Sequence, residues 1–420
     1  MSKWQTSIIE EFKSRAENPR TGGSEFPLME DCFDQDEVLA AIDVLLSGQL
    51  TMSSNVTEFE QQFAEMVGVP FAVMVNSGSS ANLLAVAAAI NPLRKQRLLP
   101  GDEVLLPAVC WSTSLWPLVQ LGLKPVFVDV NPQTLNMDMD DAKKKLTKKT
   151  KGLLTVHILG NSPEMAKVKS FVSDHGLTHL EDTCESFGSQ FSNKYLGTFG
   201  DFGSYSFYYS HHLTTGEGGM VVCQNQEDAD LLKCLRAHGW TRNLSNRQAL
   251  EKEYSDIDSR FLFVNSGFNL RPTEIQAAIG KVQLKRINQM NGNRVKNYEG
   301  LRLALESHPS WNGQLEMILP SPGTSPVWFG FCALLNEKLA AQKESYLKSL
   351  SALGVENRPI VSGNFVRQPA LKLYGLDQDP RNFPGAENVD RRGFFIGLHT
   401  TEMKKDRLDR LADLLLKPLL

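Results

Sequence analysis

The sequence predicts an α/β protein with a mainly parallel central sheet and a smaller C-terminal α+β domain. Short apolar runs alternate with helix-like segments between residues 71 and 223. These runs are apolar almost throughout, which is typical of strands that helices cover on both faces. A long helical pattern follows Gly267 and predicts the connection into the second domain.

The order of the expected elements defines three regions. Residues 1–35 form an N-terminal arm, and apolar residues then recur at helical spacing over 36–46 and 56–67. Strands are expected at 71–75, 102–109, 124–130, 152–159, 177–183, 204–209 and 218–223, with a buried helix at 81–90. The large domain is therefore expected at 36–284 and the small domain at 285–420.

Composition excludes several classes of partner. The chain has 420 residues and a net charge of −4, so it offers no basic surface for nucleic acid or an anionic membrane. It has no apolar stretch of about 18 residues, and its start resembles no secretion signal. Its six cysteines form no CxxC pair and are expected to be reduced thiols of a cytoplasmic protein.

The motif N-S-G-S-S-A-N at 76–82 predicts a phosphate site. A strand, a Gly/Ser turn and a helix start present unpaired backbone N–H groups to an anion. Gly78 allows close approach of the backbone and Ser79 adds a hydroxyl donor. The alternative is a serine N-cap on a buried helix.

Two further motifs place polar or aromatic side chains after strands. Trp111 follows an apolar strand and is expected at the carboxyl edge of the sheet, where it can stack on a planar ring. The segment E-D-T-C-E at 181–185 follows another apolar strand. Asp182 can hold the protonated nitrogen of a pyridine ring, and Glu185 can contact an oxygen at position 3 of the same ring. The alternatives are a core tryptophan and an acidic loop or helix cap.

The stretch from Ser206 to Gly219 reads S-F-Y-Y-S-H-H-L-T-T-G-E-G-G. It resembles S-F-x-x-x-K-N-x-T-T-G-E-G-G of the sugar-aminotransferase family, which makes amino sugars for antibiotics and surface polysaccharides. The resemblance runs through nearly the whole chain, with S-G-Q-L-T at 47–51, V-H-I-L-G at 156–160 and G-F-N-L-R at 267–271.

This resemblance implies an aspartate-aminotransferase-like (type I) fold that binds pyridoxal 5′-phosphate (PLP). It also implies a homodimer with shared active sites, in which Asn269 reaches the cofactor phosphate of the neighbouring subunit. Glu185 stands where most members have glutamine. The cofactor-binding positions that the resemblance implies in this chain are Gly78, Ser79, Trp111, Asp182, Glu185, Ser206 and Asn269.

His211 occupies the position of the family's lysine, which holds the cofactor covalently and moves protons. Imidazole cannot form that stable bond, but it remains a general acid or base near neutral pH. The resemblance therefore implies non-covalently bound PLP or pyridoxamine phosphate (PMP), with His211 as the catalytic base. His212 is expected to make a structural hydrogen bond.

Two branches of the family carry this histidine, and both remove the 3-hydroxyl of a nucleotide-linked 4-keto-6-deoxyhexose. One branch needs four clustered cysteines for a [2Fe–2S] centre, whereas only Cys223 and Cys234 follow His211 within about a hundred residues. No iron–sulfur cluster and no metal are therefore expected. The patterns at 236–242 and 358–369 resemble the iron-free branch, which acts on a GDP-linked 4-keto-6-deoxymannose.

The expected function is thus a PLP/PMP-dependent 3-dehydratase that binds a nucleotide sugar and uses L-glutamate to regenerate PMP. Arg242 and Arg271 are candidates for clamping glutamate's carboxylate, and His238 can assist in the site or cap the helix that contains Cys234. The alternative for each arginine is a surface or interface ion pair. Two other functions stay open, namely an aminotransferase with another proton shuttle and an inactive binding or sensor protein.

Overall fold

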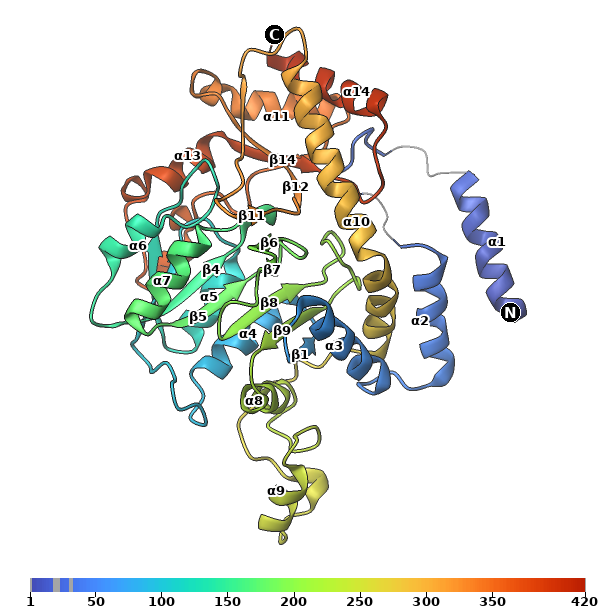
Figure 1. The fold of residues 1–420 in the computed structure, drawn as a ribbon, viewed down its shortest axis with the longest axis vertical. Coiled ribbons are helices and arrows are strands. Elements are labelled where there is room, and N and C mark those ends of the chain that lie inside the picture. Colours follow the sequence, from blue (N-terminus) through green and yellow to red (C-terminus); the bar gives the residue numbers. More distant parts are fainter. Residues whose placement is uncertain (1, 18–22, 30–32, 420) are drawn as a thin grey trace.

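The computed structural model describes residues 2–17, 23–29 and 33–419. Helix α1 (Lys3–Glu17) belongs to the expected N-terminal arm, and residues 1, 18–22 and 30–32 of that arm lie outside the described residues. In Figure 1 the large sheet lies in the middle of the molecule, and the C-terminal domain lies above it.

The large sheet confirms the expected α/β class. Over the described residues its strand order is β1, β9, β8, β5, β4, β2, β3. β9 is antiparallel to both of its neighbours, and the other neighbours are parallel. The strand bounds are β1 (Phe71–Val75), β2 (Glu103–Pro107), β3 (Lys124–Val128), β4 (Thr150–Val156), β5 (Thr178–Asp182), β8 (Phe202–Ser206) and β9 (Gly219–Cys223).

Helices cover both faces of this sheet because successive strand residues point to opposite sides. In β1, Val73 packs into one hydrophobic cluster and Met74 into another. The first face carries α4 (Gly78–Ala89), α5 (Ser112–Gln120) and α8 (Gln226–Arg236). The second carries α3 (Ser54–Val67), α6 (Met139–Lys145) and α7 (Met165–His175).

Helix α10 (Glu274–Glu306) links the two domains, as Figure 1 shows. A capping box between Thr273 and Gln276 fixes its start. The expected boundary at 284/285 falls inside this helix, so both domains pack on it. The small domain has an antiparallel sheet of β10 (Leu315–Met317), β12 (Gly330–Leu335), β14 (Gly393–Gly397) and β13 (Asn357–Arg358), with helices α11 (Lys343–Ala352), α12 (Ala370–Leu373), α13 (Pro384–Arg392) and α14 (Lys405–Leu416).

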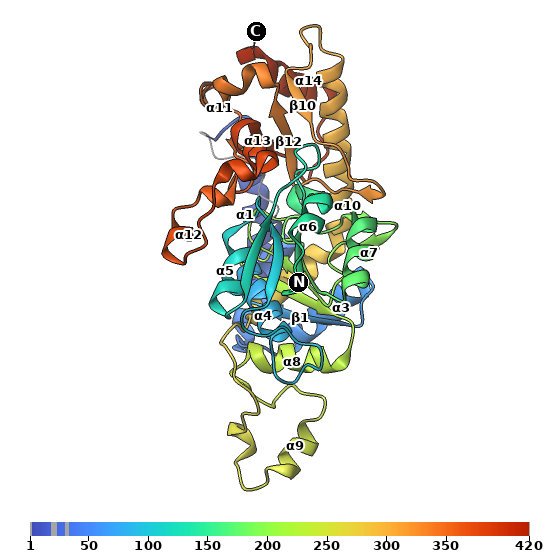
Figure 2. The same ribbon diagram turned by 90° about the vertical axis from the view of Figure 1, so that its left-hand side faces the viewer.

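The remaining elements lie around these two sheets. Helix α2 (Gln35–Ser47) packs along α10, and α9 (Arg247–Glu253) projects from the far end of the molecule in both Figure 1 and Figure 2. A small sheet is formed by β6 (Gln190–Phe191), β7 (Lys194–Tyr195) and β11 (Thr324–Ser325). Short 3₁₀ helices occupy Ile158–Gly160, Ser259–Phe261, Glu337–Gln342, Phe365–Arg367, Pro380–Asn382 and Lys417–Leu419.

A buried carboxylate fastens α10 to the start of α3. Glu274 accepts hydrogen bonds from the backbone N–H groups of Ser53, Asn55 and Val56, at 2.6, 2.9 and 3.0 Å. It also accepts one from the Asn55 amide at 3.0 Å. Glu274 therefore satisfies donors at a helix N-terminus that would otherwise be buried without partners.

Within the described residues, no helix has both the length and the apolar character needed to cross a membrane.

Replacing Glu274 by alanine is expected to lower the free energy of unfolding by about 3 kcal/mol, because several buried N–H donors lose their acceptor. Urea denaturation followed by circular dichroism measures this change. The matched control is Glu299→Ala on the same helix, where an exposed pair with Arg302 is lost and the expected change is below about 1 kcal/mol. Equal effects of the two variants would contradict this role of Glu274.

Candidate active site

A cavity of about 420 Å³ opens where β4, β5 and β8 end. The carboxyl edge of a parallel sheet is the usual place for a ligand in this fold class. Side chains from both domains line the cavity, and the polar and aromatic ones are Ser77, Ser79, Asn82, Trp111, Thr113, His157, Asp182, Glu185, Ser206, Tyr208, Ser210, His211, Glu217 and Phe329.

The first wall of the cavity is the start of α4. The Ser77 hydroxyl accepts a hydrogen bond from the Ser80 N–H at 3.1 Å and caps the helix, while Gly78 and Ser79 line the cavity. The serine N-cap is thus observed at Ser77, and the phosphate site at Gly78 and Ser79 stays a prediction. A Cβ on Gly78 would lie 2.4 Å from the Ser206 Cβ, so only glycine at position 78 lets the start of α4 pack this closely against Ser206. The result is a cup of N–H and O–H donors suited to a phosphate.

Asp182 ends β5 as a buried carboxylate that faces the cavity. One oxygen, Oδ2, accepts hydrogen bonds from the Asn82 amide at 2.8 Å and the Ser114 hydroxyl at 2.7 Å. The other, Oδ1, accepts one from the Cys184 N–H at 3.2 Å. These donors fix the orientation of the carboxylate, which suits a cationic ring nitrogen.

Glu185 lies on the next turn of the same loop. Burial raises the pKa of Glu185 to about 7, the N–H of Leu159 opposes this rise from 3.2 Å, and the charge of Asp182 adds to it. Glu185 therefore titrates near neutrality, unlike an exposed glutamate. Trp111 lies at the mouth of the cavity with 57% of its surface exposed, which leaves its ring face free to stack.

His211 lies in the loop between β8 and β9, and its ring contacts two aromatic side chains. The ring centroids of Tyr208 and Phe329 lie 5.8 and 5.2 Å from that of His211, both in edge-on geometry. Burial lowers the pKa of His211 to about 3, with a smaller contribution from the charge of Arg294. The imidazole is therefore neutral at physiological pH.

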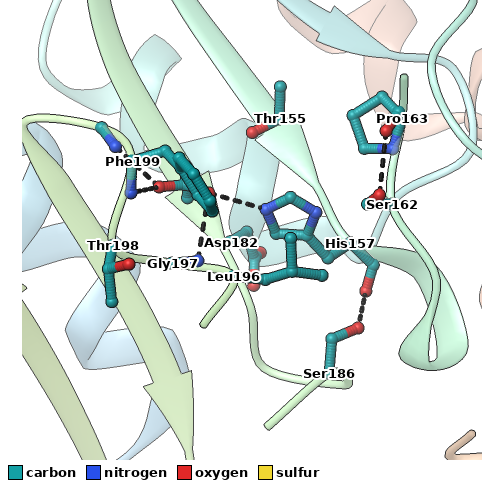
Figure 3. Close-up of polar contacts among 12 residues, drawn as sticks. Thr155, His157, Ser162, Pro163, Asp182, Ser186, Leu196, Gly197, Thr198 and Phe199 are labelled. Atoms are coloured by element: carbon teal, nitrogen blue, oxygen red, sulfur yellow. Dashed lines mark hydrogen bonds and ion pairs between the residues drawn. The ribbon is translucent and has the colours of Figure 1, made fainter. Parts of the chain in front are cut away.

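A second buried carboxylate, Glu181, precedes Asp182 in β5 and points to the opposite face of the sheet. His157 contacts it at 3.0 Å, and the backbone N–H groups of Gly197, Phe199 and Gly200 donate to it at 3.0, 2.6 and 2.7 Å (Figure 3). Burial alone would raise the pKa of Glu181, but these hydrogen bonds and the nearby histidines lower it to about 2. The turn that leads into β8 is thus fixed by a charged group.

Four of the predicted site residues lie outside this cavity. A second pocket of about 340 Å³ is lined by Arg242, Asn269 and Arg271. The two guanidinium groups lie 4.0 and 5.9 Å from the ring centre of Trp240, and the ring of His238 packs against the same tryptophan at 5.2 Å. Among the described residues, neither arginine forms a salt bridge within the chain.

Several residues of the cavity were not singled out from the sequence. Asn82 ends the 76–82 motif, where its amide was a usable signal. Ser114 does not line the cavity, but its hydroxyl donates to Asp182 from three residues after Trp111. Tyr208 and Ser210 lie within the motif that contains His211. Phe329 lies in the apolar run 327–331, which carries no signal beyond that of a core strand. His212 makes the expected structural hydrogen bond, from Nε2 to the Val327 carbonyl at 2.9 Å.

The sheet order, the helix start at Gly78 and the carboxylate of Asp182 together define an aspartate-aminotransferase-like fold of type I. The chain belongs to the DegT/DnrJ/EryC1/StrS aminotransferase family, whose sequence profile matches residues 31–416.

Similar proteins point to one branch of this family. GDP-4-keto-6-deoxy-D-mannose 3-dehydratase of Escherichia coli O55:H7 is 39% identical over 392 residues, which are 93% of this chain and 99% of that protein. The structure of the E. coli enzyme with bound hydrated PLP matches with a TM-score of 0.87 and 38% identity, over 94% of this chain and all of the other. A second structure of this dehydratase, with a trapped PLP-glutamate geminal diamine, matches at a TM-score of 0.86 and 38% identity, over 93% and 100% of the two chains.

Replacing Glu185 by glutamine is expected to change how stability depends on pH. The folded state raises the pKa of Glu185 above its unfolded value, so the natural chain loses part of its free energy of unfolding as pH rises from about 4.5 to 7. Glutamine does not titrate and shows no such loss. The free energy of unfolding of the variant, relative to the natural chain, should therefore increase by about 2 to 3 kcal/mol between pH 5 and pH 8.

Urea unfolding of the cofactor-free protein at the two pH values measures this difference. Glu402→Gln, which removes an exposed partner of Lys296, is the control and should show no such trend. A Glu185→Gln variant whose relative stability is the same at both pH values would contradict the raised pKa.

Proposed function

We propose that this chain is a PLP/PMP-dependent 3-dehydratase that removes the 3-hydroxyl of a GDP-linked 4-keto-6-deoxymannose. The observation that carries the proposal is the imidazole of His211, which takes the place of an amine in a cavity otherwise built for PLP. Dehydratases of this name are similar to nearly the whole chain, and their branch acts in deoxysugar biosynthesis.

The cavity fits the cofactor group by group. The donor cup of Gly78, Ser79 and Ser206 suits its phosphate, Asp182 suits its pyridine nitrogen and Glu185 its 3-oxygen. Trp111 would cover one face of the ring. When bound, the cofactor supplies an electron sink for the bonds that break at the substrate.

In this proposal, the imidazole of His211 accepts a proton during the reaction and passes it on. Its Nδ1 is buried without a hydrogen-bond partner among the described residues, so Nε2 is the nitrogen that can meet a ligand. Burial keeps the imidazole uncharged at neutral pH, so a nitrogen lone pair is available to a proton. No lysine is among the described residues that line the cavity, so this cavity offers no amine for a covalent bond to the cofactor.

The electron balance requires a second substrate. Replacing the C3–O bond of the sugar by a C–H bond consumes two electrons and two protons. Glutamate supplies them as it takes up one water and becomes 2-oxoglutarate and ammonia. The 3-hydroxyl leaves as water, so the overall reaction forms no net water. A related dehydratase structure holds glutamate joined to PLP, which supports glutamate as the donor.

We further propose that two copies of the chain share each site. Arg242, Asn269 and Arg271 form a cationic pocket that does not include the chain's own His211. Guanidinium groups without an acidic partner suit the carboxylates of glutamate or a diphosphate. A homodimer that places this pocket over the partner's cavity completes the site, with His238 beside Trp240 at its edge.

Incubation with glutamate, PLP and GDP-4-keto-6-deoxymannose is expected to give a sugar nucleotide lighter by one oxygen, together with 2-oxoglutarate and ammonia. Mass spectrometry and an ammonia assay detect these products. His211→Asn should lower the rate by about 100-fold or more, because the proton acceptor is lost.

Borohydride treatment of the PLP-loaded protein serves as the control, and it should leave the mass of the chain unchanged. The His211→Lys variant should instead gain the mass of the reduced cofactor. A borohydride adduct on the natural chain, or an aminated sugar as the product, would overturn the dehydratase proposal.

Mixing His211→Asn and Arg271→Ala chains tests the shared site. Each variant alone should be nearly inactive, whereas a mixed dimer contains one intact site in two. After random reassociation the mixture should recover about a quarter of the natural activity. If the activity of the mixture stays at the sum of the activities of the two variants, His211 and Arg271 act within one chain.

A further inference from the structure

The segment 327–329 of the small domain contacts both histidines of the loop between β8 and β9. The ring centroid of Phe329 lies 5.2 Å from that of His211, with an angle of 79° between the rings. It lies 5.7 Å from the ring centroid of His212, at 60°. Two residues earlier, the Val327 carbonyl accepts the hydrogen bond from His212 Nε2 at 2.9 Å.

The backbone of Phe329 is fixed from two sides. Its N–H donates to the Leu159 carbonyl at 3.0 Å, and its carbonyl accepts from the guanidinium of Arg294 at 2.9 Å. Arg294 is buried on α10 and also donates to the Leu398 carbonyl at 2.8 Å. Phe329 is therefore held at a defined position between the two domains.

We infer that Phe329 is a positioning residue for His211, whose ring it holds against Tyr208 and shields from water. This inference rests on the proposed function, in which His211 moves the proton. Tyr208 also contacts the imidazole edge-on, with ring centroids 5.8 Å apart. An imidazole turns about only two side-chain bonds, so two aromatic contacts restrict its orientation strongly.

Removal of water is the second effect of Phe329. Its apolar ring packs where a solvent molecule could otherwise solvate the imidazolium, and burial is the main cause of the low pKa of His211. Among the described residues, Arg294 and His212 act electrostatically on the imidazole. The titratable groups that line the same cavity are His157, Asp182, Cys184, Glu185, Tyr208 and Glu217.

The same segment also connects His211 with Glu185. Leu159 accepts from the Phe329 N–H through its carbonyl, and it donates its own N–H to Glu185 at 3.2 Å. Leu159 has a φ of 50°, a left-handed conformation that is unfavourable for leucine. These two hydrogen bonds compensate that cost, so a shift of Phe329 changes the surroundings of both ionisable groups.

Substitutions of Phe329 test the inference. Phe329→Leu keeps an apolar side chain of similar volume without a flat ring, Phe329→Ala opens the space, and Phe329→Tyr retains the ring. The matched control is Phe395→Leu in β14, because Phe395 packs on Phe329 at 6.1 Å between ring centroids and makes no ring contact with His211.

The first readout needs no cofactor and no turnover. Imidazole signals are followed by NMR in histidine-labelled, cofactor-free protein, and His211→Asn identifies the signal of His211. In the natural chain this signal should not titrate between about pH 5 and pH 9, whereas in Phe329→Ala it should titrate with an inflection near 6. Phe329→Tyr and Phe395→Leu should behave like the natural chain.

The second readout is steady-state dehydration. Phe329→Ala and Phe329→Leu should lower kcat by about 10- to 100-fold with KM for the sugar nucleotide within about threefold, because a displaced base slows the chemical step more than binding. Phe329→Tyr should restore kcat to within about threefold of the natural value.

The inference is overturned if folded Phe329→Leu and Phe329→Ala match Phe395→Leu in both the imidazole titration and kcat. If Phe329→Ala does not fold, the leucine and tyrosine variants decide by the same criteria. A His211→Asn variant that still dehydrates the sugar would refute the proposed function instead, and the titration would still report whether Phe329 sets the environment of His211.

Discussion

The buried Asp182 carboxylate is the interaction on which the site depends. One of its oxygens receives Asn82 from α4 and Ser114 from α5, so the helix that begins the phosphate cup and the helix that follows Trp111 are held by one charge. Its backbone carbonyl accepts from the N–H of His157, which ties the end of β5 to β4. Loss of this charge would leave buried donors unpaired on two helices.

The adjacent residue performs a similar task on the other side of the sheet. Because neighbouring strand residues point to opposite faces, Glu181 and Asp182 bind different partners although they are consecutive. Glu181 collects the N–H groups of the turn before β8, and β8 then carries Ser206 to the phosphate cup. Two consecutive acids thus position the cavity from both sides.

The sequence predicted those features of the site that lie within one short segment of the chain. The motifs around Gly78, Asp182 and His211 each lie in one short segment, and the parallel sheet brings their strand ends together. Strand ends were less accurate, since the strand expected at 204–209 stops at Ser206, where the chain turns and exposes Tyr208 and Tyr209. Phe329 was missed because an apolar run has the same pattern whether it fills a core or contacts a catalytic group. The cationic pocket was predicted by residue type, but its separation from His211 depends on tertiary structure.

The exchange of lysine for histidine changes what the surrounding protein must supply. A lysine amine lies at the end of a flexible chain, and its covalent bond to the cofactor fixes both groups at once. Imidazole forms no such bond, so in the proposed enzyme its orientation would come from packing, and the cofactor would be held by its phosphate, its ring face and Asp182. The contacts of Tyr208 and Phe329 with His211, and of His212 with Val327, provide that packing. Because the second set of contacts comes from the small domain, the position of the base depends on how the two domains pack along α10.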